Sequence, residues 1–219
     1  CLLCFIKKNK KLLYSRRLPQ KIMEVFTSKM KKLLAIVVLG LLWSNTSYSY
    51  VMQDLINSLE ETKKPKSIEI AKTLKSINAS EKSYDLVIRK ANLNIKDAKN
   101  IANAISRVEK NNGPKLHTLS MSFNPELKDE GVIALLNQIP KTTSVIAFVE
   151  CGITDKAGQA IIDWVAKTNN LDGIYIEGNT FSKSMEARFE KLRNDNAKLT
   201  VLSEWASDEF KEMVKKSFN

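Results

Sequence analysis

The sequence offers few side chains that could carry out catalysis, and the first of them is its single histidine, His117. A histidine acts as a general base only when an acidic or nucleophilic side chain lies within hydrogen-bonding reach. The sequence assigns no such partner to His117, so we expect a surface histidine. Cys151 could act as a nucleophile, but a reactive thiolate needs an exposed, electropositive setting. Its place in a repeated pattern favours a structural role instead.

Two acidic and two aromatic residues complete the candidates. Asp129 and Asp155 could form a pair of catalytic carboxylates, but each opens a stretch with helical spacing, where aspartate is favoured as the N-cap. Trp164 and Trp205 could stack on sugar rings, but packing roles are expected for both. The region after residue 49 contains no CxxC, HExxH, GxSxG or phosphate-loop pattern. The sequence therefore predicts a protein that is not an enzyme and needs no cofactor or metal.

An apolar pattern recurs along the chain. Residues 171–181 read L-x-x-L-x-L-x-x-N-x-L, with isoleucine and phenylalanine in some of the leucine positions. Residues 116–127 give the same pattern with one inserted residue, residues 146–153 give a shorter copy, and residues 86–93 give a degenerate one. A fifth copy opens at Leu199 and then loses the pattern. The first strand position recurs at intervals of 33, 27 and 28 residues, at Leu86, Leu119, Ile146 and Ile174.

A stretch with helical spacing follows each strand pattern. After Asp129 and Asp155, small or apolar residues recur two, six and ten positions further on, which is the spacing of one helix face. A strand, a loop and a helix in a unit of about 28 residues resemble the ribonuclease-inhibitor-like class of leucine-rich repeats. The resemblance covers roughly residues 84–202. It implies a short α/β solenoid of about four repeats, with a parallel sheet on its concave face.

The resemblance assigns a role to each position of the repeat. Because one strand and one helix cannot bury their apolar faces alone, neighbouring repeats must stack around a shared core. The expected core residues include Leu119, Met121, Leu127, Ile146, Phe148 and Ile153. A turn position after each strand holds a short side chain that binds open backbone groups, here Asn124, Cys151 and Asn179. Ala91 departs from this pattern, so we expect an irregular first repeat.

In this class, the residues between the core positions line the concave face of the sheet. They form one row of Val87, Ser120, Ala147 and Tyr175, a second of Arg89, Ser122, Val149 and Glu177, and an edge of Phe123 and Glu150. Apolar or aromatic side chains are frequent among them and lysine is absent, which is typical of protein-recognition surfaces. We therefore predict a site for a protein or peptide there. The alternative is a structural or accessory envelope protein whose terminal helices make the contacts.

The first part of the chain has the features of a secretory signal. Two lysines follow Met30 and precede an apolar run of eleven residues, and a small-x-small pattern ends at Ser49. This order is typical of a signal peptide, placed at residues 30–49, and the run is shorter than the about 20 residues of a transmembrane helix. Because the chain begins with Cys1, we interpret residues 1–29 as an upstream or mis-started extension. The sequence thus predicts export to the periplasm or the medium, with only transient membrane contact through the signal.

The net charge of +11 belongs mainly to this leader. Residues 1–49 contain ten Lys or Arg and one acid, so the remaining chain holds 25 basic and 23 acidic residues and carries +2. Nucleic-acid binding rests on clustered positive charge, so no nucleic-acid partner is expected. The same remainder keeps one cysteine, Cys151, which cannot form an internal disulfide.

Helical segments are expected on both sides of the repeats. Two helices, around residues 51–61 and 67–77, are predicted within an N-terminal cap at residues 50–83. A C-terminal cap is predicted at residues 203–219, with Phe210 and Val214 on one face of its helix. The complete division is an extension at 1–29, a signal at 30–49, a cap at 50–83, a leucine-rich-repeat domain at 84–202 and a cap at 203–219.

Overall fold

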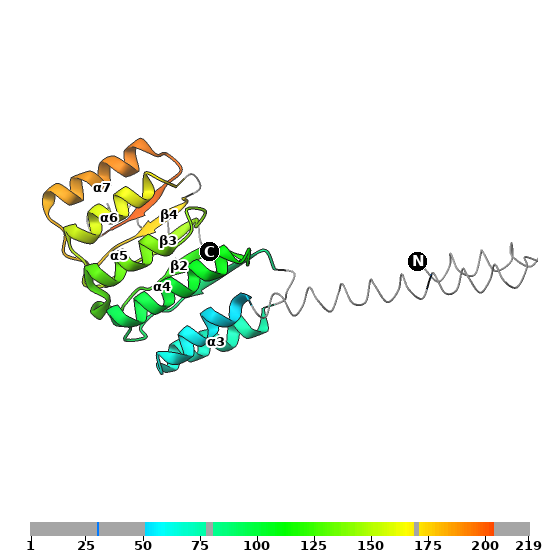
Figure 1. Ribbon diagram of the computed structural model, residues 1–219. Coiled ribbons are helices and arrows are strands. Elements are labelled where there is room, and N and C mark those ends of the chain that lie inside the picture. Colours follow the sequence, from blue (N-terminus) through cyan, green and yellow to red (C-terminus); the bar gives the residue numbers. More distant parts are fainter. Residues whose placement is uncertain (1–29, 31–50, 78–80, 169–170, 204–219) are drawn as a thin grey trace, which may run out of the picture. The chain divides into compact units, whose positions relative to one another are not determined.

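Figure 1 shows the computed structural model of the chain, which describes residue 30 and residues 51–77, 81–168 and 171–203. The chain divides into two compact units, residues 1–47 and 48–219, and the sheet with its helices lies in the second. The predicted extension, nearly all of the predicted signal peptide and all but the first residue of the predicted C-terminal cap lie outside the described residues.

Five parallel strands form one sheet, in which the order along the chain is also the order in space. They are β1 (Ser83–Val87), β2 (Lys115–Ser120), β3 (Val145–Ala147), β4 (Gly173–Tyr175) and β5 (Thr200–Leu202). Parallel neighbours need a crossover connection, and a helix supplies it each time. These helices are α4 (Ile95–Lys110), α5 (Lys128–Gln138), α6 (Asp155–Val165) and α7 (Lys183–Asp195). Figure 1 shows them side by side in the order of their strands, so the α/β class predicted from the sequence is confirmed.

The core lies between the sheet and these helices. Each of the first four strands, taken with the residues that follow it, contributes two side chains spaced by two positions that have no exposed surface: Leu86 and Ile88, Leu119 and Met121, Ile146 and Phe148, and Ile174 and Ile176. Helix residues such as Ile101, Leu135, Ile161 and Phe189 are equally buried. The core predicted from the strand pattern is confirmed, because period-two alternation places these side chains on one face of the sheet.

Two further helices precede β1. One covers residues 51–61 and the other is α3 (Pro65–Ser76), which agrees with the two helices predicted there. Pro65 stands at the first helical position, where its missing N–H would have no partner in any case. The first helix is tied to α4 by an ion pair between Asp54 Oδ2 and Arg107 Nε at 2.6 Å.

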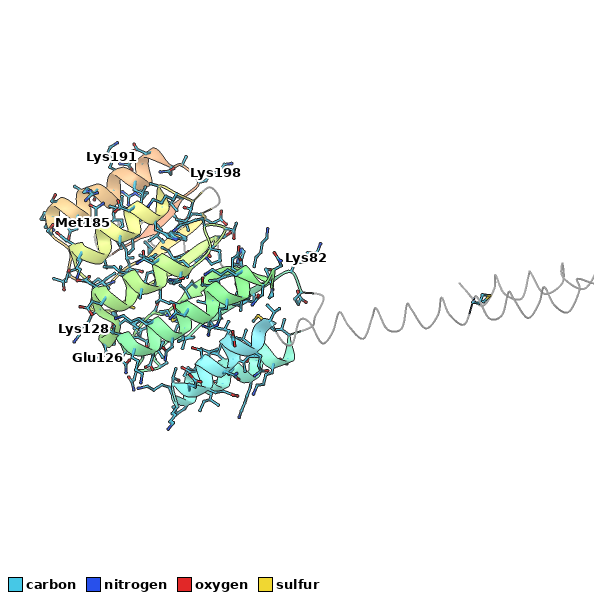
Figure 2. The ribbon with its side chains drawn as sticks, in the orientation of Figure 1. Lys82, Glu126, Lys128, Met185, Lys191 and Lys198 are labelled. Carbon is cyan, nitrogen blue, oxygen red and sulfur yellow. The ribbon has the colours of Figure 1, made fainter. Side chains whose placement is uncertain are left out.

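The parallel strands all begin at one edge of the sheet and all end at the opposite edge. These two edges hold different side chains. Figure 2 places Glu126 and Lys128, which follow β2, at the edge opposite to Lys82 and Lys198, which precede β1 and β5. A short 3-10 helix, η1 (Pro125–Leu127), lies on the first of these edges. Lys128 Nζ and Glu126 Oε2 form an ion pair there at 3.1 Å. The carboxyl ends of the strands therefore share one edge, where the turn positions also lie.

One prediction about where the helices begin is wrong. Asp129 and Asp155 are not the N-caps of their own helices, because α5 begins at Lys128 and the N-cap of α6 is Thr154. Each carboxylate instead binds the start of the next helix. Asp129 accepts hydrogen bonds from Thr154, and Asp155 accepts them from Ser182, the N-cap of α7.

Candidate functional site

The candidate site is the open face of the sheet, which we define as the face opposite α4–α7. Strand pairing places Val87, Ser120, Ala147 and Tyr175 side by side, and Leu202 of β5 continues this row. A second row follows from the backbone bonds beyond the strand ends: Arg89, Ser122, Val149 and Glu177. The structure thus brings the two predicted rows together on one surface.

The exposure predicted for this face is wrong at its centre. Val87 is 37% exposed, but Ser120 is 7% exposed, Ser122 1% and Ala147 8%. Ser122 is tied into the sheet, because its Oγ lies 3.4 Å from Ser120 Oγ and accepts a hydrogen bond from Val149 N at 3.3 Å. The sequence pattern shows which face a residue lies on, but it does not show what covers that face.

Tyr175 is the largest side chain of the first row and is half-buried. A Cβ added at Gly173 would lie 2.9 Å from Tyr175 Cε2, so the ring turns back along its own strand. Burial, with a smaller contribution from the charge of Glu177, raises the pKa of the Tyr175 hydroxyl. The group therefore stays a neutral phenol that can donate a hydrogen bond at physiological pH.

Phe123 stands at the carboxyl edge, held in a left-handed backbone conformation with φ 61°. Its ring lies beneath two cations, with Arg89 Cζ 5.0 Å and Lys90 Nζ 4.9 Å from the ring centre. Cation–π contacts of this kind are each worth about 0.5–1 kcal/mol at exposed sites. The predicted edge residue is thus joined to Arg89 of the second row, and Lys90 adds a second positive charge that was not predicted there.

Side-chain amides at the turn positions connect neighbouring strand–helix units. Asn124 Oδ1 accepts hydrogen bonds from Ala91 N and Leu93 N, each at 3.0 Å, and Asn124 Nδ2 donates to Ile88 O and Met121 O. Asn179 repeats the arrangement two units later. It accepts from Cys151 N and Ile153 N and donates to Phe148 O and Ile176 O. Each amide therefore satisfies backbone groups of two successive turns, which would be costly to leave unpaired.

Cys151 occupies the turn position between these two asparagines and is fully buried. Its Sγ donates to Met121 O at 3.2 Å and contacts Val149 O at 3.5 Å. Burial raises the pKa of the Cys151 thiol to about 12, although the backbone N–H groups of Asn124 and Phe123 act in the opposite direction. A thiol in this state is not the thiolate that nucleophilic chemistry needs.

The other residues considered for chemistry lie apart from this face or have structural contacts. His117 is exposed, and its Nδ1 lies 3.3 Å from Asp85 Oδ1 and 3.1 Å from Thr118 Oγ1. Trp164 is buried in the core with Lys141 Nζ 4.9 Å from its ring centre. Trp205 lies outside the described residues.

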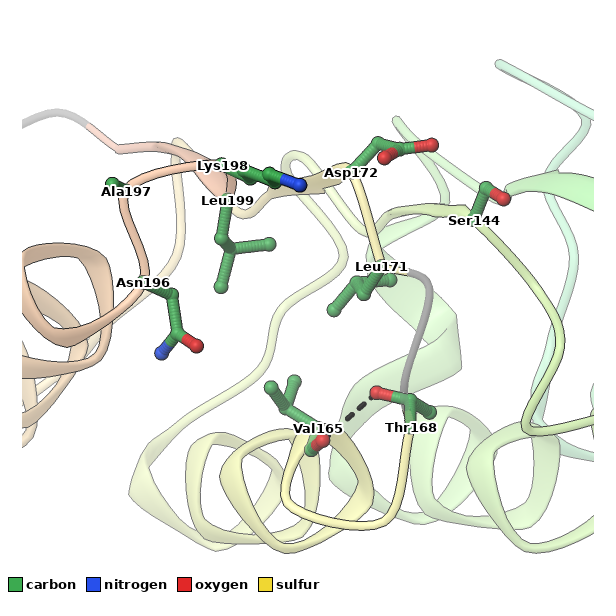
Figure 3. Close-up of a pocket in the computed structure, with 9 residues that line it drawn as sticks. All are labelled: Ser144, Val165, Thr168, Leu171, Asp172, Asn196, Ala197, Lys198 and Leu199. Atoms are coloured by element: carbon green, nitrogen blue, oxygen red, sulfur yellow. Dashed lines mark hydrogen bonds between the residues drawn. The ribbon is translucent and has the colours of Figure 1, made fainter.

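A cavity of about 490 Å³ opens at the edge where β4 and β5 begin (Figure 3). It is lined by Ser144, Val165, Thr168, Leu171, Asp172, Asn196, Ala197, Lys198 and Leu199. Thr168 Oγ1 donates a hydrogen bond to Val165 O at 2.8 Å across its floor (Figure 3). These lining residues supply one carboxylate and one ammonium but neither an imidazole nor a thiol, so they do not form a nucleophile activated by histidine.

In the part of the chain that the structure describes, no three His, Cys, Asp or Glu side chains gather as a metal site would require. Among the same residues, no helix is both long and apolar enough to cross a membrane. No protein-family model matches the chain, and no curated protein matches it.

Two contributors to the face were missed in the sequence. Leu202 belongs to the first row because it pairs with Tyr175, and its place in the degenerate fifth copy was the available signal. Gly173 lies beneath the Tyr175 ring. Its signal was a glycine two residues before an aromatic residue in a strand, a position where a side chain is often absent because a neighbour occupies the space.

Proposed function

We propose that this protein is an exported, non-catalytic binding module, built as a short leucine-rich-repeat solenoid of the ribonuclease-inhibitor-like class. Two features support the solenoid. The strands follow one another in sequence order with one helix between each pair, and the turn amides of Asn124 and Asn179 bind equivalent backbone groups 60 residues apart, as Ala91 N and Cys151 N show. Each unit contacts mainly its neighbours, which is how stacked repeats gain their stability.

The observation that carries the binding proposal is the difference between the two faces of the sheet. One face is closed by α4–α7, whereas the other presents Val87, Val149 and Tyr175 in two aligned rows. Aromatic and apolar side chains at a surface with few lysines favour a protein or peptide over a nucleic acid. The balanced charge of the chain after residue 49 supports the same choice.

The test compares two single substitutions in a crosslinking pulldown from envelope extract. Tyr175→Ala should reduce capture of the partner by about thirtyfold in affinity, since truncation of a central hot spot typically costs about 2 kcal/mol. Lys167→Ala, which removes an exposed side chain after α6, should leave capture unchanged. If only Lys167→Ala weakens capture, the alternative of a structural envelope protein that acts through its helices or caps is favoured.

Export is tested separately by N-terminal sequencing of material from the periplasm or the medium. We expect the mature chain to begin at Tyr50 or a near neighbour, because the small-x-small pattern ends at Ser49. Recovery of an intact Met30 in the membrane fraction would contradict a cleaved signal.

A further inference from the structure

Two cations lie together at one end of the open face. Arg89 Cζ and Lys90 Nζ lie 5.0 Å and 4.9 Å from the centre of the Phe123 ring, so both positive charges are held over the turn that follows β2. Both side chains are exposed. The cation–π contacts fix the place of the two charges without neutralising them. This end of the face is therefore positive.

Two carboxylates lie at the other end of the face. The side chain of Glu150 lies against Gly178, since a Cβ added to that glycine would meet Glu150 Cγ. Gly178 follows Glu177 directly. Burial, and after it the charge of Glu177, raises the pKa of the Tyr175 hydroxyl, so this second carboxylate lies near β4 as well. The end of the face formed by β4 is therefore negative.

These two ends do not neutralise each other. In residues 51–77, 81–168 and 171–203, no ion pair involves Arg89, Lys90 or Glu150. Phe123 and Gly178 lie two strands apart, which is about 10 Å at about 4.8 Å per strand. Exposed charges at that separation are largely screened, because the Debye length is about 8 Å at physiological ionic strength. Both ends therefore keep their charge for a second molecule.

We propose that the open face pairs with the open face of a second copy of this chain, about a two-fold axis that runs parallel to the strands between β2 and β3. Such an axis places β1 of one copy opposite β4 of the other, and β2 opposite β3. The association does not rest on the function proposed above, because it needs no other partner. A partner on the same face would compete with it.

This arrangement brings charges of opposite sign together. It places Arg89 opposite Glu177 and Lys90 near Glu150 of the second copy, because both copies keep their carboxyl edges on the same side of the dimer. Two-fold dimers use the same patch on both subunits, so a patch with two positive and two negative charges is complementary to itself. A partner with charge of one sign would be repelled at one end of this patch. A second copy matches both ends at once.

The uncharged side chains of the first row fit the same axis. Val87, which is 37% exposed, lies opposite Tyr175 of the second copy. Ser120 and Ala147 face each other at the centre, where small side chains let the two sheets approach. Five strands of about six residues cover about 24 Å by 20 Å, which is less than the about 800 Å² that each partner buries in a standard interface. We therefore expect a weak dimer, with a dissociation constant of about 10–100 μM.

The experiment measures association between copies of the full chain by Förster transfer, with donor and acceptor dyes at the N terminus, from about 1 μM to 1 mM protein. Any association through the chain before residue 51 is common to all variants. Arg89→Glu with Lys90→Glu makes all four charges negative, and Glu150→Lys makes most of them positive. The control, Lys96→Glu with Lys99→Glu, makes the same change of charge on exposed side chains of α4.

Each of the two charge variants alone should associate about tenfold more weakly than the parent, because like charges then meet across the axis. An equal mixture of the two variants should recover to within about threefold of the parent, because the negative face of one meets the positive face of the other. The control should stay within about twofold of the parent. A variant that is merely damaged is not rescued by mixing. If the double substitution does not fold by circular dichroism, Lys90→Glu alone replaces it in the same comparison.

Three results would overturn the proposal: a parent that shows no transfer at about 1 mM, a mixture that associates no better than either variant alone, or a control that weakens association as much as the charge variants do. Raising the salt concentration from about 50 to 500 mM should also weaken the parent dimer by about tenfold, and an association that ignores salt would contradict pairing by these charges. The measurements use this protein alone. Their failure therefore leaves the Tyr175→Ala pulldown prediction standing, and failure of that pulldown leaves the dimer standing.

Discussion

Asp129 binds the start of the helix that follows its own: its Oδ2 accepts a hydrogen bond from Thr154 Oγ1 at 2.7 Å. Its Oδ1 accepts two more, from Thr154 N at 2.8 Å and Ala157 N at 3.1 Å. Asp155 does the same for Ser182, with bonds of 2.8 Å to N and 2.6 Å to Oγ. These bonds satisfy the open N–H groups at a helix start and also join successive units. The same hydrogen bonds therefore bind the starts of α6 and α7 and connect neighbouring strand–helix units.

We expect Asp129→Ala to lower the free energy of unfolding by about 1–2 kcal/mol, because it removes three hydrogen bonds at the start of α6. Urea unfolding followed by circular dichroism measures the change. Glu130→Ala is the control, since Glu130 is the exposed neighbour of Asp129 and should change stability by at most about 0.5 kcal/mol. Equal effects of the two substitutions would show that Asp129 does not cap α6.

Cys151 gives a prediction about the turn positions. Cys151→Asn should be tolerated, within about 1 kcal/mol, because an amide donor can reach Met121 O, which now accepts from Sγ at 3.2 Å. Cys151→Leu should cost about 1–3 kcal/mol, because backbone groups at the bend lose a partner and the buried site must enclose a larger side chain. Thermal unfolding of both variants against the parent measures the difference. If both variants melt at the same temperature, Cys151 has no role in the turn.

The raised pKa of Cys151 predicts a specific loss of stability in alkali. The thiol has a pKa of about 12 in the folded chain, against 9.0 for an unperturbed cysteine, so the unfolded chain loses this proton first. The stabilisation is complete below pH 9 and disappears between pH 9 and 12. Between pH 8 and pH 10, the parent should lose about 1 kcal/mol more than Cys151→Asn. Parallel stability curves for the two proteins over this range would contradict the assignment.

The sequence predicted the face on which a residue lies better than it predicted the surroundings of that residue. Period-two alternation correctly placed Ile146 and Phe148 inward and Ala147 on the opposite side. It could not show that Ala147 is 8% exposed, because alternation determines the face of the sheet and not how closely the neighbouring side chains pack there. The capping aspartates show the same limit: Asp129 has the residue type of a cap, but its partner lies 25 residues ahead at Thr154.

The turns before the asparagine positions were also beyond sequence reasoning. Lys90, Phe123 and Glu150 all adopt positive φ, at 55°, 61° and 48°, as does the equivalent Gly178 at 70°. Only the glycine signals a left-handed turn, because other residues rarely adopt it without support. For Lys90 and Glu150 the support comes from the next unit, whose turn amide accepts a hydrogen bond from the following backbone N–H: Ala91 N donates to Asn124, and Cys151 N donates to Asn179.

Phe148 provides the sharpest test of the inward register. It is one of the largest fully buried side chains of the core, and an unpaired charge in such a place costs several kcal/mol. That cost is comparable with the whole stability of a domain, about 5–15 kcal/mol, so Phe148→Asp should abolish cooperative thermal unfolding. Val87→Asp introduces the same carboxylate into a strand on the open face, at a side chain that is 37% exposed, and should keep a cooperative transition. If Phe148→Asp melts like the parent, the assignment of core and open faces is reversed or wrong.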